Sequence, residues 1–495
     1  MFPTLAEVKA IAAGGDYRRV PVCRELMADR FTTVEVMRIL RAASRHCFLL
    51  ESAEQDKTWG RWSFLGADPE LELTCSDGLL RIREGYREQD VRETVTQVEH
   101  PGEAIRGILA RCKSPKMEGM PPFTGGLVGY FSYDYIKYAE PTLRVGAPED
   151  RDFRDVDLML FDRVIAFDNY RQKVLLIAGV DTADIDAGYA AAERELEEMA
   201  ALLREGRRAD FPPLKLKEEL TPRFSVQEYG AMVERGKHYI REGDIFQVVL
   251  SNPQTAAAEG SLFDTYRVLR TLNPSPYMFY FSSDDMEIAG ASPETLVKLE
   301  DGVLHTFPLA GTRPRGRTDE EDAELERSLL ADEKEKSEHN MLVDLGRNDI
   351  GRISELGSVE VEKYLTIQRF SHVMHIGSTV RGTLRQGLDA VDAVDSILPA
   401  GTLSGAPKLR ACEIIQELEG CKRGIYGGAI GYLDFAGNLD TCIAIRLAYK
   451  KNGRVCVQSG AGIVADSVPE TEAVECQNKA RAVVNALRAA EEGLE

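Results

Sequence analysis

Apolar and polar positions along the first 210 residues alternate between strand-like and helix-like spacing. Residues Cys47 to Glu51 form a short apolar run typical of a strand, and residues 156–168 and 173–180 predict two further strands. The charged segment 185–204 has the period of a helix. This part of the chain therefore mixes both kinds of element.

The rest of the chain shows a similar mixture with longer loops. Residues 225–242 predict a helix, and 243–251 predict a turn that leads into a buried strand. Between the two parts, residues 205–222 combine charge runs with Pro212, Pro213 and Pro222, which is typical of a linker. Strands and helices do not alternate regularly, so we predict an antiparallel-rich α+β fold rather than a doubly wound α/β fold.

A glycine pattern occurs twice. Residues 125–130 spell Gly-Gly-Leu-Val-Gly-Tyr, and residues 427–432 spell Gly-Gly-Ala-Ile-Gly-Tyr. Glycine within a strand marks a bulge or a close approach of two backbones. The echo is short, but it suggests a duplicated sheet architecture.

The helix predicted over residues 334–349 carries acids on its apolar stripe. At helical period Glu335, Glu338, Leu342 and Leu345 share one face. Ionised carboxylates on an inward face need a cation or a donor, so a metal or a substrate ammonium would suit them. The alternative is a solvated helix whose acids pair with neighbouring lysines.

A second helix near the C-terminus repeats this feature. Residues 467–470, Ser-Val-Pro-Glu, have the form of a capping box with proline in the first turn. The helix that follows places Glu475 and Lys479 on the stripe that Val483 and Leu487 continue. Two inward acids on two helices, Glu338 and Glu475, suit a hard cation such as Mg²⁺, with Glu472 as a rival ligand.

Composition limits the partners and the compartment. The 495 residues carry a net charge of −20, which argues against nucleic acid or an acidic membrane as a partner. The nine cysteines are scattered without C-x-x-C spacing, so neither a disulfide framework nor zinc is indicated. With no apolar run of membrane-spanning length, we expect a soluble cytoplasmic protein. An anionic substrate would then need a local basic site.

Three features could supply chemistry. The strand expected over 441–446 puts Arg446 on the face of two small residues, as a carboxylate clamp would require, although a strand-end arginine can equally reach solvent. Gly460, Ala461 and Gly462 would let backbone N–H groups approach an anion. Glu294 follows a proline at the end of an apolar stretch and could be a buried general acid or a helix-start carboxylate.

Histidines are few, and two of them lie three residues apart. His372 and His375 would share one face of a helix, as a metal pair would. No further His or Cys nearby completes a ligand set. One structural histidine and one acid/base histidine is therefore the better interpretation.

Together these motifs resemble the chorismate-utilising enzymes. The resemblance rests on residues 292–294 (Ser-Pro-Glu), 311–316 (Gly-Thr-Arg-Pro-Arg-Gly), 338–344 (Glu-His-Asn-Met-Leu-Val-Asp), 402–408 (Thr-Leu-Ser-Gly-Ala-Pro-Lys) and 460–479. They occur in order over most of residues 225 to 485. The family implies an antiparallel-rich sandwich with surrounding helices, in which 211–495 would be the catalytic domain and 1–210 would contribute a regulatory pocket.

Two positions discriminate within the family. Its water-adding members, the isochorismate and salicylate synthases, have a lysine base where this chain has Gln247. The 4-amino synthases have a nucleophilic lysine before the Gly-Thr pair, where this chain has Ala310. The resemblance therefore implies addition of ammonia at C2 of chorismate and release of anthranilate and pyruvate, the first committed step of tryptophan biosynthesis.

The resemblance also assigns roles within the site. Glu338 and Glu475 would hold Mg²⁺ on the ring carboxylate of chorismate. Substrate carboxylates would be anchored by a further set of residues: Gly311, Thr312, Tyr426, Arg446, Gly460, Ala461, Gly462 and Lys479. Acid, base and positioning roles would belong to Glu294, His375, Thr402, Glu335 and Gln247, with Glu335 as the candidate base.

Partners follow from the same resemblance. No G-x-C-x-G nucleophile elbow of a glutaminase occurs, so ammonia would come from a separate glutamine amidotransferase subunit, in a heterotetramer of two large and two small subunits. L-tryptophan would inhibit by binding at Glu51, Ser52, Pro276, Tyr277 and Met278. Two rivals remain: a catalytically silent chorismate-binding regulatory subunit, and a synthase that stops at aminodeoxyisochorismate, as in phenazine pathways.

Overall fold

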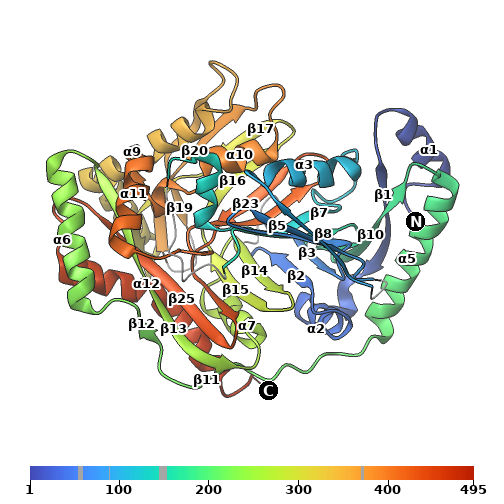
Figure 1. Cartoon of the computed structure of the whole chain (residues 1–495), viewed down its shortest axis with the longest axis horizontal. Helices are drawn as coiled ribbons and strands as arrows, with labels where there is room; N and C mark the ends of the chain where they lie inside the picture. Colours follow the sequence, from blue (N-terminus) through green and yellow to red (C-terminus); the bar gives the residue numbers. More distant parts are fainter. Residues whose placement is uncertain (54–59, 88–89, 144–152, 370–372, 495) are drawn as a thin grey trace.

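Two large antiparallel sheets form the centre of the molecule, with helices on their outer faces (Figure 1). The structure is a computed structural model that describes residues 1–53, 60–87, 90–143, 153–369 and 373–494. The antiparallel α+β sandwich predicted from the sequence is confirmed.

The first sheet has thirteen strands in the described chain. Its main path runs in the order β1 (Arg19–Met27), β10 (Lys173–Asp181), β9 (Val164–Asp168), β3 (Trp62–Ala67), β2 (Cys47–Glu51), β14 (Tyr277–Ser282), β15 (Met286–Ser292), β24 (Leu447–Lys451), β25 (Arg454–Ile463), β13 (Gln247–Glu259) and β11 (Lys215–Leu216). Two short strands also pair with β13, namely β12 (Thr221–Pro222) and β21 (Gly405–Ala406).

The second sheet has twelve described strands. Its order is β18 (Leu309–Pro314), β20 (Val373–Thr383), β17 (Val303–Thr306), β16 (Thr295–Glu300), β23 (Leu439–Ile443), β22 (Ala429–Asp434), β7 (Gly126–Phe131), β8 (Val156–Phe161), β4 (Leu71–Ser76), β5 (Leu79–Glu84) and β6 (Arg92–Gln97), with β19 (Glu360–Arg369) beside β20.

Helices cover both outer faces. They are α1 (Leu5–Ala13), α2 (Thr33–Ala43), α3 (Gly102–Arg111), α4 (Ile136–Ala139), α5 (Ile185–Glu205), α6 (Val226–Glu242), α7 (Phe263–Leu272), α8 (Asp319–Ala331), α9 (Glu333–Gly351), α10 (Ala390–Ile397), α11 (Lys408–Glu419) and α12 (Pro469–Ala490). Short 3₁₀ turns include η1 (Ala28–Arg30), η2 (Tyr133–Tyr135) and η4 (Gly401–Leu403).

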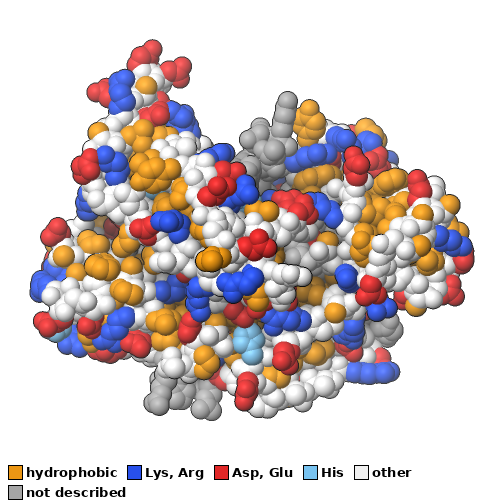
Figure 2. Space-filling view, turned by 90° about the horizontal axis from the view of Figure 1, so that it is seen from above, with side chains coloured by type: hydrophobic (Ala, Val, Ile, Leu, Met, Phe, Trp, Pro, Cys, Tyr) orange, Lys and Arg blue, Asp and Glu red, His pale blue; other side chains and the backbone are white. Residues whose placement is uncertain are grey.

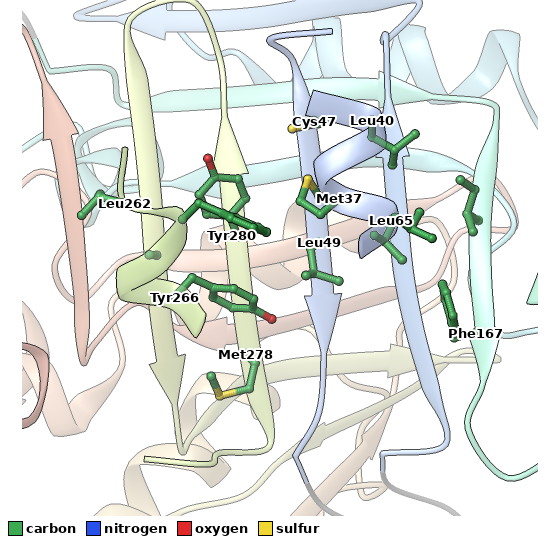
Figure 3. Close-up of a cluster of buried hydrophobic side chains, with 14 of the residues drawn as sticks. Met37, Leu40, Cys47, Leu49, Leu65, Phe167, Leu262, Tyr266, Met278 and Tyr280 are labelled. Carbon is green, nitrogen blue, oxygen red and sulfur yellow. The ribbon is translucent and has the colours of Figure 1, made fainter. Parts of the chain in front are cut away.

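Strand alternation builds three apolar layers. Phe48 of β2 and Phe161 of β8 meet between the two sheets. The next residue, Leu49, points to the opposite face, where the first sheet packs on α2, α5, α7 and α12 (Figure 3). The outer face of the second sheet packs on α3, α9 and α10. The central strands of each sheet are thus buried on both faces and are apolar runs rather than alternating ones, whereas edge strands such as β6 are exposed.

The two halves of the chain share both sheets. Strand β2 pairs with β14 in the first sheet, and β7 pairs with β22 in the second. The boundary expected near residue 210 therefore corresponds to no gap in either sheet. Residues 205–222 are not a free linker, because β11 and β12 pair with β13 and Leu214 is fully buried.

The repeated glycine pattern lies at the junction of the halves. Gly129 of β7 and Gly431 of β22 are direct cross-strand partners. A Cβ on either residue would stand 2.0 Å from a backbone oxygen of the next strand, Asp157 or Asp440. The close backbone approach inferred from the sequence is therefore present, and the structure agrees with a duplicated architecture.

Three local predictions need correction. Residues 156–168 form two strands, β8 and β9, because Asp162 and Arg163 make a turn between the sheets. The strand expected to reach Arg446 ends at Ile443, and Arg446 has a left-handed backbone with φ +52°. The N-cap of α12 is Val468 rather than Ser467, whose hydroxyl instead accepts from the Val464 N–H at 3.1 Å.

Candidate active site

A cavity of about 830 Å³ lies beside the C-terminal half of the first sheet. Its wall combines segments distant in sequence: the starts of β13 and β18, the N-terminal turns of α9 and α12, the ends of β23 and β25, and the turn η4. Of the candidate site residues, those in the wall are Gln247, Glu294, Gly311, Thr312, Glu338, His375, Thr402, Tyr426, Arg446, Gly460, Gly462, Glu475 and Lys479.

Three acids of the wall come from two helices. Glu338 lies on α9, and Glu472 and Glu475 lie on α12. The Glu338 side chain is exposed rather than buried as the sequence predicted, but partial desolvation in the cavity raises its pKa, and the nearby Glu335 carboxylate raises it further. Burial also raises the pKa of Glu472, which is 9% exposed, and the Glu475 charge adds to this. These acids therefore repel one another in a setting that disfavours negative charge.

This set of donors fits a divalent cation. Among the described residues no group of three or more His, Cys, Asp or Glu side chains forms a protein-only metal site. Mg²⁺ does not need one, since it takes one or two carboxylates and fills its other positions with water and ligand oxygens. Glu475 already pairs with Lys479 at 2.7 Å, whereas Glu472 forms no ion pair in the described chain. Glu472 thus remains a rival ligand.

Arg446 supplies positive charge to the wall of the same cavity. It lies just beyond β23 in the cavity wall, and burial lowers its pKa. Within the described ranges it forms no salt bridge, and Glu294 is the acid whose charge opposes the shift. A half-buried guanidinium without a carboxylate partner is poorly compensated. It is therefore suited to a carboxylate supplied by a ligand.

The glycines of β25 bring its backbone to the cavity. Gly460 and Gly462 line it, whereas Ala461 points to the opposite face and packs with Val248 and Ile463. A Cβ on Gly460 would stand 3.0 Å from the Tyr426 hydroxyl. Two of the three residues of the predicted anion site thus line the cavity, and their contact with an anion stays a prediction.

Glu294 has the properties of a general acid. It stands one residue before β16, and burial raises the pKa of its carboxyl to about 7. The Thr402 hydroxyl on η4 donates to Glu294 Oε1 at 3.2 Å and opposes part of that shift. A carboxylic acid poised near neutrality can deliver a proton to a leaving group.

His375 lies in strand β20, not in a helix, and His372 is outside the described residues. His375 Nδ1 is 2.8 Å from the Gly311 carbonyl oxygen, which fixes Nδ1 as the protonated nitrogen. Burial lowers the pKa of His375, so the neutral imidazole is favoured. That state suits a hydrogen-bonding role better than the role of a proton donor.

Glu335 lies one helical turn before Glu338, beside Gly311 of the wall. It is absent from the described cavity wall, and its carboxylate lies 3.5 Å from Arg313. The expected stripe of Glu335, Glu338, Leu342 and Leu345 is therefore divided. The residue that follows Glu338, His339, is fully buried, and its Nε2 atom lies 2.6 Å from the Ser378 hydroxyl.

Gln247 is the first residue of β13 and is 5% exposed. Its Oε1 atom has no hydrogen-bond partner in the parts of the chain that the structure describes. An orphaned buried acceptor in a cavity wall is suited to a donor on a ligand.

Several wall residues were not singled out from the sequence. Gln458 and Ser459 precede Gly460 on β25, and Ser337 and Met341 flank Glu338 on α9. Strand alternation predicts that Gln458 shares a face with Gly460 and Gly462, so the glycine pair was a usable signal for it.

Pairing of β2 with β14 brings the expected effector residues together. Met278 pairs with Glu51, and the Ala53 N–H donates to the Ser275 carbonyl at 3.0 Å. Figure 3 shows Met278 beside Tyr266 on the helix-covered face of the sheet. The Glu51 carboxylate already accepts from Thr33 at 2.9 Å, and it also bonds Tyr266 and Arg270.

One detail of that pocket was wrong. Tyr277 and Met278 were expected to contact the same indole, but consecutive strand residues point to opposite faces. The Tyr277 hydroxyl donates to Asp440 at 2.8 Å, between the sheets, whereas Met278 lies in the outer core. A ligand that touches Met278 therefore does not touch the Tyr277 ring.

On the face in Figure 2, the described residues form no extended basic patch. Acidic and basic side chains are interspersed over the face in Figure 2, and the net charge is −20. No helix in the described ranges is both long and apolar enough to span a bilayer. Any anion must therefore be held locally, by residues such as Arg446 and Lys479 in the cavity.

Comparison with protein families gives one match over most of the chain. The model for chorismate binding enzymes matches residues 19–485. Anthranilate synthase component 1 of Acetivibrio thermocellus is 46% identical over 499 residues, which is 99% of both chains. The component 1 protein of Pseudomonas aeruginosa is 44% identical over 498 residues and also covers 99% of both chains.

Solved structures agree. Anthranilate synthase component I from Streptococcus pneumoniae superposes with a TM-score of 0.74 at 38% identity, covering 87% of this chain and 93% of that one. The menaquinone-specific isochorismate synthase of Escherichia coli has a TM-score of 0.67 at 18% identity, covering 98% of this chain and all of that one. The second likeness concerns the fold alone.

Proposed function

The chain belongs to the chorismate binding enzyme family, and from this premise we propose that it is an anthranilate synthase large subunit that converts chorismate and ammonia to anthranilate and pyruvate. The observation that carries the proposal is the charge arrangement of the cavity. Arg446, a cation without an ion pair in the described chain, lines the same cavity as Glu338, Glu472 and Glu475. A dicarboxylate would neutralise the arginine, and a divalent cation would neutralise the glutamates.

Ground-state binding would use the cationic and glycine-lined walls. Arg446, Lys479 and the N–H groups of β25 would hold the two carboxylates of chorismate. The Tyr426 hydroxyl, packed against Gly460, would limit how the ring turns. Glu338 and Glu475 would hold Mg²⁺, which when bound supplies Lewis-acid stabilisation of the charge that develops as the 4-hydroxyl leaves.

Glu294 would give its proton to the departing 4-hydroxyl, positioned by Thr402. We assign the acid role to Glu294 rather than His375, because the pKa of His375 is lowered and that of Glu294 is raised to about 7. His375 would orient substrate as a neutral group held by Gly311. Glu335 stays a prediction as the base, since its carboxylate lies toward Arg313.

Gln247 favours ammonia over water as nucleophile. A neutral amide cannot act as the general base that water requires. Its orphaned Oε1 can accept a hydrogen bond from ammonia, which needs orientation rather than deprotonation to attack. Transfer of a proton from C2 and loss of pyruvate would then give the aromatic ring.

Regulation and assembly complete the proposal. A separate glutamine amidotransferase subunit would supply ammonia, in a heterotetramer of two large and two small subunits. L-tryptophan would bind where β2 meets β14, against Ser52, Pro276 and Met278, with Glu51 held nearby by Arg270. Tryptophan biosynthesis is the setting that the component 1 relatives support.

The test is a product analysis. The purified chain should release equal amounts of anthranilate and pyruvate from chorismate, Mg²⁺ and ammonium, faster at raised pH where NH₃ is abundant, and should ignore glutamine. Accumulation of aminodeoxyisochorismate without pyruvate would instead identify the phenazine-type synthase. Binding of chorismate without any product would identify the silent regulatory subunit.

A further inference from the structure

A buried ion pair lies directly behind the active-site wall. Arg423 and Glu419 have side chains that are each 1% exposed. Arg423 Nη2 donates to Glu419 Oε1 at 2.5 Å, and Nε donates to Oε2 at 2.9 Å, which is a bidentate fork. Neither residue lines the cavity, so neither can touch substrate.

The remaining donors of Arg423 go to two backbone carbonyls of the wall. Nη1 donates to the Leu403 carbonyl at 2.6 Å, and Nη2 donates to the Val249 carbonyl at 2.6 Å. Leu403 follows Thr402, and Val249 lies two residues after Gln247. One guanidinium thus ties the turn η4 to strand β13.

Glu419 extends the same network to β25. It accepts from the Ser251 N–H at 2.7 Å, and Gln458 Nε2 donates to the Ser251 hydroxyl at 2.8 Å. Gln458 lines the cavity beside Gly460. The pair therefore adds buried side-chain bonds between three wall segments, η4, β13 and β25. Backbone bonds also join them, since β13 pairs with β25 and the Val249 N–H donates to the Ser404 carbonyl at 2.9 Å.

The surroundings of Arg423 are shaped to hold it. The guanidinium carbon lies 4.6 Å from the Tyr133 ring centroid and 5.9 Å from that of Tyr426. Tyr133 belongs to η2, in the N-terminal half, and its N–H donates to the Gly424 carbonyl at 2.8 Å. A buried ion pair is a poor source of stability, because an apolar pair of the same volume often serves as well. We therefore infer that the Arg423–Glu419 pair serves to position the groups it contacts rather than to stabilise the fold.

We propose that Arg423, fixed by Glu419, is a positioning residue that sets the Thr402 hydroxyl and the Gln247 amide at their places in the cavity. A lysine at position 423 keeps the charge but lacks the planar fork, so its three N–H donors cannot reproduce the four hydrogen bonds of the guanidinium. This inference rests on the proposed function for the roles of Thr402 and Gln247. It adds a residue that acts on the reaction only through others.

The first experiment compares R423K with the parent chain. We expect kcat for chorismate consumption to fall by about 10- to 100-fold, with the KM for chorismate changed less than about threefold, since displacements near 1 Å cost that much in rate. Thr402 would act on the leaving hydroxyl and not in ground-state binding, so the loss belongs to kcat. An R423K chain with kcat within twofold of the parent would overturn the proposal.

A double variant separates positioning from folding. Glu419→Leu with Arg423→Met replaces the pair by apolar groups, and we expect a urea midpoint near that of the parent while kcat stays low. Arg154→Lys is the matched control, because the Arg154 side chain is only 14% exposed, pairs with Asp157 at 2.5 Å and does not line the cavity. It should lose stability and keep kcat. Recovery of kcat in the double variant would show a purely structural role.

Amide hydrogen exchange tests the placement without reference to chemistry. In R423K, residues 398–405 should exchange faster, whereas β1 and β10 should be unchanged; unchanged exchange in 398–405 would contradict the proposal. If the parent released a product other than anthranilate, the proposed function would fail while the kcat comparison still tested Arg423. If the parent did not consume chorismate, exchange alone would decide.

Discussion

The N-terminal and C-terminal halves of the molecule have the same strand order. Their charged side chains at equivalent positions differ: they form ion pairs in the first half and line a cavity in the second. From the junction outward, the first sheet runs β2, β3, β9, β10, β1 on one side and β14, β15, β24, β25, β13 on the other. The second sheet runs β7, β8, β4, β5, β6 and β22, β23, β16, β17, β20. Each half thus follows the chain in the same sequence, and α5 follows β10 as α12 follows β25.

Equivalent positions can be compared directly. Glu70 stands one residue before β4 in the run Gly-Ala-Asp-Pro-Glu, and Glu294 stands one residue before β16 in Gly-Ala-Ser-Pro-Glu. Arg19 opens β1 as Gln247 opens β13. Asp162 lies in the turn between β8 and β9, as Arg446 lies between β23 and β24. These three equivalent positions therefore carry charged or polar side chains in both halves.

In the N-terminal half these groups neutralise one another. Arg19 donates to Glu70 at 2.8 Å and to Asp162 at 2.7 Å, and Arg87 also bonds Asp162. In the C-terminal half, Glu294 and Arg446 face a cavity instead. There β17 is followed by β18, α8, α9 and β19 before β20, and this extra segment brings Gly311 and Glu338. A site arises where the charges are left for a ligand to satisfy.

The largest effect is expected at the equivalent glutamates of the two halves, Glu70 and Glu294. Glu294→Gln should lower kcat by about 10²- to 10⁴-fold, the usual value of a general acid, whereas Glu70→Gln should leave turnover unchanged. Steady-state rates of both variants check this. Equal losses in the two would mean that position 294 acts on the fold and not on the reaction.

The same glutamate predicts a pH dependence. Burial raises the pKa of Glu294 from 4.5 to about 7, so the folded state binds the proton more tightly. The contribution to stability is complete below about 4.5 and is lost as pH rises through about 7. Urea unfolding of the parent relative to Glu294→Gln should show this decline, and kcat/KM for chorismate, measured at a constant concentration of NH₃ rather than of total ammonium, should fall above the same pH. A flat difference between the two proteins would contradict the assignment.

The next effect concerns the two arginines. Arg446→Met should reduce kcat/KM by about 10²-fold or more, since a carboxylate of the substrate loses its charged partner. It should also raise the free energy of unfolding, because a half-buried cation without an ion pair is removed. Arg19→Met should instead lower stability by about 1–3 kcal/mol and spare turnover, since Arg87 still pairs with Asp162. The reverse pattern would mean that Arg446 is structural.

A smaller effect sharpens the metal assignment. Glu338→Gln and Glu475→Gln should raise the Mg²⁺ concentration for half-maximal rate by about 10- to 100-fold, because a neutral amide is a poor ligand for a hard dication. Glu472→Gln should shift it far less. Titration of Mg²⁺ binding by calorimetry gives the ranking independently of turnover. If Glu472→Gln ranks above Glu475→Gln, the ligand is Glu472.

The smallest effect on turnover is expected at the junction of the halves. Ser52→Phe should fill the space beside Pro276 and abolish inhibition by tryptophan, while uninhibited kcat changes less than about twofold, since Ser52 is remote from the chemistry. Coupling between the sites should be about 1–3 kcal/mol, and chorismate should weaken tryptophan binding by the same factor. Inhibition that persists unchanged in this variant would place the effector elsewhere.

Much of the fold and of the site could be predicted from sequence. Local spacing identified α5, α6 and β2, and the repeated glycines indicated a duplication that the pairing of Gly129 with Gly431 bears out. Single residues such as Gln247 and Ala310 distinguished branches of the family, because the chemistry of a side chain does not depend on its surroundings to exclude a role. A neutral amide cannot be a strong base wherever it lies.

Only the tertiary structure decided which atoms face the ligand. Helical period placed Glu335 and Glu338 on one stripe. In the structure the Glu335 carboxylate lies 3.5 Å from Arg313 of β18, whereas Glu338 lines the cavity. The placement of Arg446 depends on a left-handed backbone after β23. The side chains of Tyr277 and Met278 point to opposite faces of the first sheet. Periodicity fixes positions relative to their own element. Which face is buried, and against what, is set by segments hundreds of residues away, as Arg423 shows by holding Val249 and Leu403 together.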